Sequence, residues 1–289
     1  IQTYLGVLLT PEDLHFDARV NFSGRSVLAP GAGLTYEQMG LPEEMAWTLF
    51  GPQVIERLGD EQAVTQRSEQ AALVLDELMA NSWILVHHIA TTRHTSLIAF
   101  RPVRHPDKVI RIPFLACEPL DADFDGDQSA VYLPQTEEGQ REAGELLSLA
   151  GHLARDPELL NELTPHRDPM WGLAALSLSE AGQKAIQNAV GAAVDFAPGF
   201  VTRQALVDAL RPQLQSLGAD HVLAAIDALM QLGFDALRET GFSLNPFVTL
   251  GLEIPEAPPV DRPDLWDLYM QQRAEQLLAT EEYDGDWGH

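Results

Sequence analysis

Leu120-Asp121-Ala122-Asp123-Phe124-Asp125-Gly126-Asp127-Gln128 is the stretch that decides both the fold and the chemistry of this chain. Its carboxylates stand at alternate positions, and a glycine precedes the last of them. In an extended or tightly looped backbone, alternate side chains point the same way, so Asp123, Asp125 and Asp127 can converge on one point. Three converging carboxylates repel one another unless a cation lies between them. The spacing therefore predicts a hard-cation site of the Mg²⁺ type.

Two other interpretations of this stretch compete with a magnesium site. A solvated acidic turn is one, because Asp and Gly are common loop residues, but strict alternation between apolar flanks makes it the weaker reading. A calcium loop of the EF-hand type is the other. Its closing bidentate glutamate would fall at position 132, which is Tyr132, and the flanks have the pattern of strands instead of helices. The EF-hand interpretation therefore fails.

Composition limits the class of protein. The chain has 289 residues, 45% of them hydrophobic, which is ample for one large domain or two modest ones. No apolar run is long enough for a membrane span and no leader is evident, so we expect a cytoplasmic protein without a membrane partner. The single cysteine, Cys117, excludes an intrachain disulfide and has the character of a small core residue. A net charge of −25 predicts nucleic-acid binding only within an assembly.

Hydrophobic periodicity predicts a mixed β core followed by helices. Strands are expected within residues 19–35 and at 83–86, 95–103, 109–116 and 129–133, with the acidic loop joining the last two. Two inserted helices are expected within about residues 41–81, one of them over 62–79. Helices are then expected at 137–149, 179–194, 202–217 and 219–240. Residues 257–289 form a tail that is first proline-rich and then acidic.

The acidic loop resembles the active-site signature of the largest catalytic subunit of multisubunit RNA polymerase, the bacterial β′ type. That signature reads Asn-Ala-Asp-Phe-Asp-Gly-Asp-Gln, and residues 122–128 match it without change. The segment from Arg19 to Val27 resembles the family's Arg-Val-Asp-Tyr-Ser-Gly-Arg-Ser-Val, and Gly40-Leu41-Pro42 resembles the start of its inserted helix. Further similarity, including Leu232-Gly233-Phe234, extends to about residue 256.

This resemblance implies a fold, a reaction and a set of partners. The fold would be α+β, with a double-psi β-barrel over residues 1–140 that carries inserted helices, and a helical pore- or funnel-like module over 141–256. The catalytic residues would be Asp123, Asp125 and Asp127, which would bind Mg²⁺ for nucleotidyl transfer to an RNA 3′ end. A nucleoside triphosphate and a β-type subunit carrying a second barrel would be required, and the enzyme would be inactive without its partner subunits. Arg19 and Arg25 are the expected nucleic-acid contacts.

Several residues depart from the family pattern at functional positions. Asp121 replaces the Asn, and His88 the Arg, that in the family sense the ribose hydroxyls, so both are candidate nucleotide contacts of altered chemistry. Glu43 and Glu44 replace two lysines. An alternative therefore stays open, in which the chain is a catalytically impaired paralogue that acts as a binding or regulatory protein. A metal-dependent nuclease or phosphatase lacks an obvious general base and ranks below both.

Overall fold

A computed structural model describes residues 21–88, 92–197, 199–240, 265 and 269 of the chain. The chain divides into two compact units, Ile1–Glu239 and Thr240–His289. The description below concerns the first unit, because few residues of the second are described. The predicted boundaries at residues 140 and 256 stay a prediction. Among the described helices, none has the length and apolar character that crossing a bilayer requires.

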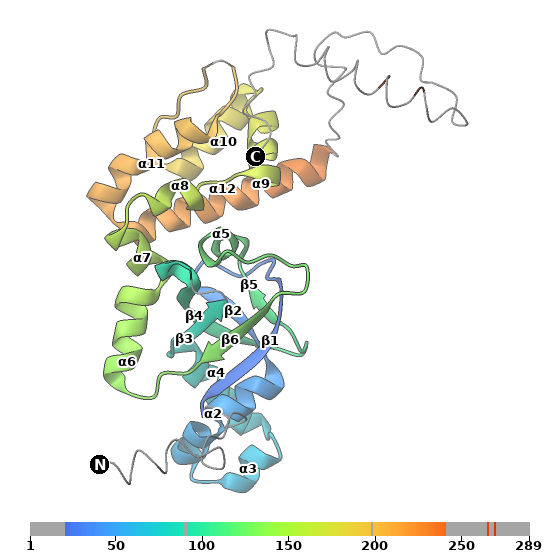
Figure 1. Ribbon diagram of the computed structural model, residues 1–289, viewed down its shortest axis with the longest axis vertical. Coiled ribbons are helices and arrows are strands. Elements are labelled where there is room, and N and C mark those ends of the chain that lie inside the picture. Colours follow the sequence, from blue (N-terminus) through green and yellow to red (C-terminus); the bar gives the residue numbers. More distant parts are fainter. Residues whose placement is uncertain (1–20, 89–91, 198, 241–264, 266–268, 270–289) are drawn as a thin grey trace. The chain divides into compact units, whose positions relative to one another are not determined.

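Six strands close into a barrel in the order β1-β5-β2-β4-β3-β6 (Figure 1). Their bounds are β1 (Ser23–Pro30), β2 (Gln38–Pro42), β3 (Ile84–His88), β4 (Leu97–His105), β5 (Ile110–Ile112) and β6 (Gln128–Tyr132). The pairs β1–β5 and β2–β4 are parallel, and the other four pairs are antiparallel. The predicted α+β fold built on a double-psi barrel is thereby confirmed.

Apolar side chains of the strands fill the barrel. Leu41, Ile84, Phe100, Ile112 and Val131 are completely buried, and each belongs to a different strand. Burial of such side chains contributes about 1.5–3 kcal/mol each relative to exposure. Closure also removes the unpaired strand edges that would otherwise invite aggregation. The barrel is therefore a rigid support for the loops that connect its strands.

The inserted helices form where the sequence places them, between β2 and β3. They are α2 (Glu43–Leu58), α3 (Glu61–Thr65) and α4 (Glu69–Ala80). Gly59 ends α2 in the left-handed conformation, and the side chains of Asp60 and Ser68 accept hydrogen bonds from the first turns of α3 and α4. The single helix predicted over 62–79 was wrong, because Arg67 takes a φ of 50° and Ser68 starts a new helix.

The strand predicted over 109–116 was also too long. Only residues 110–112 pair, after which Pro113 leads into the turn η2 (Phe114–Ala116) and the short helix α5 (Cys117–Leu120). Proline has no N–H for a strand ladder, and a short apolar run does not distinguish a strand from a buried turn. The acidic loop therefore joins α5 to β6 and does not connect two strands directly. The strand predicted at 95–103 similarly begins at Leu97, after the turn η1 (His94–Ser96).

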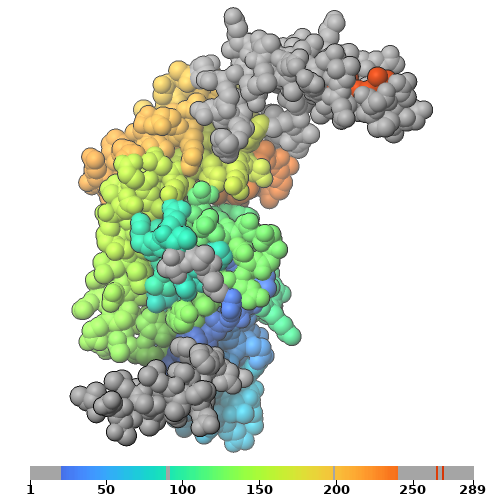
Figure 2. Space-filling view, viewed as in Figure 1, coloured from blue at the N-terminus to red at the C-terminus, as the bar shows by residue number. Residues whose placement is uncertain are grey.

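Helices make up the described chain after the barrel. They are α6 (Glu137–Glu142), the π-turn η3 (Ala143–Leu147), α7 (Leu149–Arg155), α8 (Leu159–Leu163), α9 (Arg167–Leu176), α10 (Glu180–Val190), α11 (Arg203–Leu217) and α12 (Ala219–Thr240). The helix predicted at 137–149 is broken at Ser148, whose extended backbone caps α7, and α8 and α9 were not predicted. The segment from α6 to α7 lies along the side of the barrel (Figures 1 and 2), and Ser148, the residue after η3, forms an isolated parallel bridge with Ala99 of β4.

Two glycines allow α9 and α12 to touch backbone to backbone. A Cβ atom on Gly172 would lie 1.9 Å from the carbonyl oxygen of Gly233, and one on Gly233 would lie 2.2 Å from that of Pro169. Any side chain at either position would force the two helices apart. These contacts set the position of α12 against α9.

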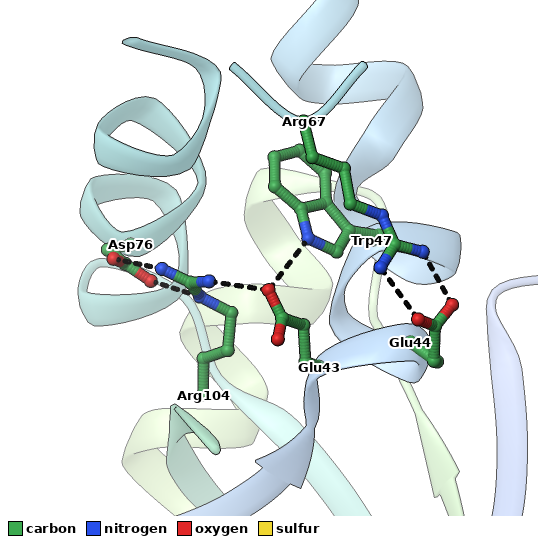
Figure 3. A network of polar contacts seen from close by, with 6 residues as sticks. All are labelled: Glu43, Glu44, Trp47, Arg67, Asp76 and Arg104. Atoms are coloured by element: carbon green, nitrogen blue, oxygen red, sulfur yellow. Dashed lines mark hydrogen bonds and ion pairs between the residues drawn. The ribbon is translucent and has the colours of Figure 1, made fainter. Parts of the chain in front are cut away.

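A network of ion pairs joins α2 and α4 to the barrel (Figure 3). Arg104 of β4 donates two hydrogen bonds to Asp76 of α4 and one to Glu43 of α2, all at 2.8–2.9 Å. Trp47 also donates to Glu43. Arg67 forms a two-pronged pair with Glu44 and lies over the indole ring of Trp47. Glu43 and Glu44 are therefore both engaged in ion pairs within the fold.

We expect Arg104→Ala to lower the free energy of unfolding by about 1–2 kcal/mol, because it removes three charge-assisted hydrogen bonds to two partly exposed carboxylates. Arg57→Ala is the matched control, since Arg57 pairs with Glu77 while both side chains are about half exposed. That variant should be nearly neutral. Urea denaturation of both variants measures the difference, and equal effects would contradict an important role for the network.

Candidate metal centre

The structure brings the three predicted aspartates together. One carboxylate oxygen from each of Asp123, Asp125 and Asp127 lies within 4.8 Å of those of the other two. Asp123 and Asp125 are exposed, whereas Asp127 is half-buried. Among the residues that the structure describes, these three aspartates form the group of His, Cys, Asp or Glu side chains that is compact enough to hold one metal ion. The convergence expected from the alternating sequence is therefore present in the fold.

The loop that carries these aspartates is fixed at its end by the barrel. The amide of Leu28 in β1 donates to the carbonyl oxygen of Asp127 at 2.8 Å, and β6 begins at the next residue. Gly126 takes a φ of +124°, a conformation that side-chain-bearing residues avoid. It redirects the chain between Asp125 and Asp127. A glycine at this point is thus required by the backbone, as its place in the sequence suggests.

Hydrogen bonds within the loop hold the carboxylates on one side. The Asp125 amide donates to Oδ1 of Asp123 at 3.3 Å, and the Asp123 amide donates to Oδ2 of Asp127 at 3.4 Å. The intervening Phe124 is half-buried against the core, where its ring meets that of Phe114 edge to face with 6.0 Å between centroids. The loop alternates between acids that face solvent and an aromatic ring that faces inward.

Repulsion among the carboxylates affects the pKa of Asp125. The pKa of Asp125 is raised, first because its carboxyl hydrogen-bonds to that of Asp123, and then because of the negative charges of Asp123 and Asp127. A bound cation relieves such repulsion, since it favours the ionised form of every ligand. The three carboxylates therefore repel one another when no cation is bound, and a hard divalent ion would relieve that repulsion.

His88 lies beside the triad, as its sequence position suggested. Its Nε2 atom is 3.1 Å from Oδ2 of Asp127, and the imidazole is largely buried. The neighbouring His87 instead lies near Tyr132, with 6.4 Å between ring centroids. Strand alternation sends these two side chains to opposite faces of β3. His88 thus reaches one of the predicted metal ligands.

The other predicted site residues occupy different places. Asp121 ends α5 with a φ of 53°, is exposed, and is not one of the three clustered acids. Arg25 is exposed on β1 opposite Ala130 of β6. Arg19 lies outside the described residues. Burial raises the pKa of the Cys117 thiol to about 12, which fits the interpretation of this cysteine as a packing residue instead of a nucleophile.

A pocket of about 400 Å³ is lined mainly by residues of β2, α4 and β4. Arg101 lines it and stacks its guanidinium over Trp83 at 3.9 Å. None of the three clustered aspartates is among the lining residues. The pocket and the acidic loop are therefore separate features. Sequence reasoning did not find this pocket, because it depends on pairing between residues far apart in the chain.

Comparisons with known proteins find similarity in the part of the chain that contains the acidic loop. The family model "RNA polymerase Rpb1, domain 2" matches residues 17–72 and 58–149. DNA-directed RNA polymerase subunit beta′ from Streptococcus equi subsp. equi is 36% identical over 176 residues, and that from Streptococcus sanguinis is 35% identical over the same length. Each alignment covers 57% of this chain and 14% of the relative.

The matched region contains every strand of the barrel and the acidic loop. The chain spans about one seventh of the length of the curated relatives that it matches. The part of the chain that matches the family in sequence is thus the part that forms the closed barrel. Residues 17–149 belong to the RNA polymerase Rpb1 domain 2 family, in a chain that is a divergent relative of bacterial β′ subunits.

Proposed function

We propose that this chain is the catalytic-barrel portion of a DNA-directed RNA polymerase β′-like subunit, which binds Mg²⁺ through Asp123, Asp125 and Asp127 for nucleotidyl transfer to an RNA 3′ end. The observation that carries the proposal is the approach of three carboxylate oxygens to within 4.8 Å of one another. Their loop lies in the part of the chain that matches the polymerase family. A β-type subunit, nucleic acid held by the assembly and a nucleoside triphosphate are the proposed partners, in a cytoplasmic setting.

The donor set suits magnesium. Three carboxylates supply hard oxygen ligands, and the exposure of Asp123 and Asp125 leaves room for water and substrate oxygens. Magnesium would lower the pKa of an RNA 3′-hydroxyl and neutralise charge on the phosphates. Oδ2 of Asp127 contacts both His88 and the Asp123 amide. The chain's own contribution is therefore to hold three acids in one fixed arrangement that an extended substrate can reach.

Reconstitution with the β-type subunit of the same source tests the proposal. We expect template-directed RNA synthesis that depends on Mg²⁺ or Mn²⁺, whereas the isolated chain should bind the ion weakly and polymerise nothing. An assembled complex that binds nucleic acid but forms no phosphodiester bond at any divalent-ion concentration would contradict the catalytic part of the proposal.

The pH dependence of ion binding follows from the raised pKa of Asp125. The folded protein holds this proton more tightly than the unfolded chain, so the associated stability is present at low pH and is lost as the pH rises through the raised pKa. A divalent ion competes with the same proton. We expect Mn²⁺ affinity to fall by up to about tenfold per pH unit below that pKa, measured by isothermal titration calorimetry. Asp125→Asn should lose both the affinity and this pH dependence.

A catalytically impaired paralogue is the second candidate, and two observations favour it. His88 stands where the family has Arg and contacts Asp127, and Glu43 and Glu44 are held in ion pairs with arginines. We expect the double variant His88→Arg, Asp121→Asn to add nucleotides at least tenfold faster in the reconstituted complex if altered ribose contacts limit the wild type. Equal rates for the two proteins would remove this argument for impairment.

A further inference from the structure

Three aromatic rings from distant parts of the chain form a continuous row that ends inside the acidic loop. Phe124 stands between Asp123 and Asp125 and meets Phe114 of η2 edge to face at 6.0 Å. Phe114 in turn meets Phe234 of α12, with 5.2 Å between centroids and 46° between the rings. Both distances lie within the range in which aromatic pairs attract each other beyond simple burial.

The outer end of this row is held firmly. Phe234 follows Gly233, whose backbone packs directly on Pro169 of α9, and Gly172 packs on Gly233 in return. A side chain that emerges from α12 next to such a contact has little freedom to move away. The middle member, Phe114, is 38% exposed, so the core alone does not fix it. Its position depends on the rings on either side.

A second contact joins the same two regions. His166, which precedes α9, places Nε2 3.5 Å from a carboxylate oxygen of Glu118 in α5, and α5 leads directly into the acidic loop. Elements from residues 166 to 234 thus contact the segment before the loop at two separate points. One contact is apolar and the other polar, so the two do not depend on a single side chain.

We propose that Phe234 is a positioning residue for the metal centre, acting through Phe114 and Phe124 to hold Asp123 and Asp125 at the spacing that one ion requires. This inference rests on the proposed metal site. It adds that α12, more than 100 residues away in sequence, influences the spacing of the metal ligands. When Phe124 is anchored, the acids on either side of it face solvent together, because adjacent side chains of the loop point in opposite directions. Loss of the anchor frees the ring to rotate and the two carboxylates to separate.

Mn²⁺ titration of the full chain and its variants tests this role. We expect Phe234→Leu to weaken Mn²⁺ binding about 5- to 30-fold with little change in the melting temperature, and Phe234→Tyr, which keeps the ring, to bind as the wild type does. Leu232→Ala is the control for a general loosening of α12, because Leu232 packs against the core and lies about 200° around the helix from Phe234. It should leave Mn²⁺ affinity unchanged.

A double-mutant cycle distinguishes an effect of Phe234 that passes through Phe114 from a general loosening of the helix packing. If Phe234 acts through Phe114, then Phe114→Leu and Phe234→Leu together should weaken Mn²⁺ binding no more than either alone. Additive effects, or normal affinity in Phe234→Leu, would overturn the inference while leaving the metal site intact. Failure of the wild type to bind Mn²⁺ would contradict the proposed function as well.

Hydrogen–deuterium exchange of the metal-free protein gives a reading that does not need an ion. The amides of Asp123 and Asp125 donate hydrogen bonds within the loop, so a loosened loop should exchange them faster. We expect faster exchange over residues 121–128 in Phe234→Leu and unchanged exchange in Leu232→Ala. Equal exchange in the two variants would overturn the inference whether or not the ion binds.

Discussion

Asp125→Ala should reduce nucleotide addition by the reconstituted complex by about 10³-fold or more, because the variant loses one of three ligands at the point where charge develops. Asp125 is the acid whose pKa the other two raise, so its removal also relieves repulsion in the metal-free protein. The variant should therefore fold normally, and its melting temperature without added ion should equal or exceed that of the wild type. Single-nucleotide extension of a labelled RNA primer measures the rate.

Asp208→Ala provides the control for this experiment. Asp208 is an exposed acid on α11 whose carboxylate accepts a hydrogen bond from Gln204 of the same helix. The substitution removes the same charge without touching the acidic loop and should leave the rate unchanged. Full activity in Asp125→Ala, with the complex still assembled, would mean that the three aspartates do not have the role proposed for them.

Gly172→Ala should be among the most destabilising single changes in the chain, at about 3 kcal/mol or more. Its new methyl group would lie 1.9 Å from the carbonyl oxygen of Gly233, and backbone atoms in two packed helices cannot move aside as a flexible side chain can. The helices α9 and α12 must then separate. Thermal or urea denaturation measures the loss, and we also expect weaker Mn²⁺ binding because Phe234 would be displaced.

Gly51→Ala is the matched control within a helix. Gly51 lies in α2, and a Cβ atom there would meet no atom within 4 Å. Alanine has a higher helix propensity than glycine, but the ring of Pro52 crowds a Cβ on the residue before it, so the two effects oppose each other and this variant should stay within about 1 kcal/mol of the wild type. A large loss in Gly172→Ala and a small effect in Gly51→Ala would show that the close approach of α9 and α12 is responsible. A neutral Gly172→Ala would contradict the close packing.

Parts of the fold follow from local sequence. The strands predicted at 83–86 and 129–133 and the helices predicted at 202–217 and 219–240 agree with the structure to within a few residues, because each has a clear apolar period or a polar cap. The errors occur where one residue overrides the period. Arg67 and Ser68 divide a helix, Ser148 breaks another, and Pro113 ends a strand early. The helix α8 has five residues, too few turns for its period to be recognised.

The candidate site also has features that follow from local sequence and others that depend on tertiary structure. The sequence by itself determined the identity and alternation of Asp123, Asp125 and Asp127 and the need for Gly126, because spacing along a backbone decides which side chains can converge. Only the tertiary structure decided that His88 reaches Asp127, that Arg104 holds Glu43 and Asp76, and that Phe234 lies against Phe114. Those contacts join residues that are tens to more than 100 positions apart. Their distances are set by closure of the barrel and by helix packing, which no local pattern encodes.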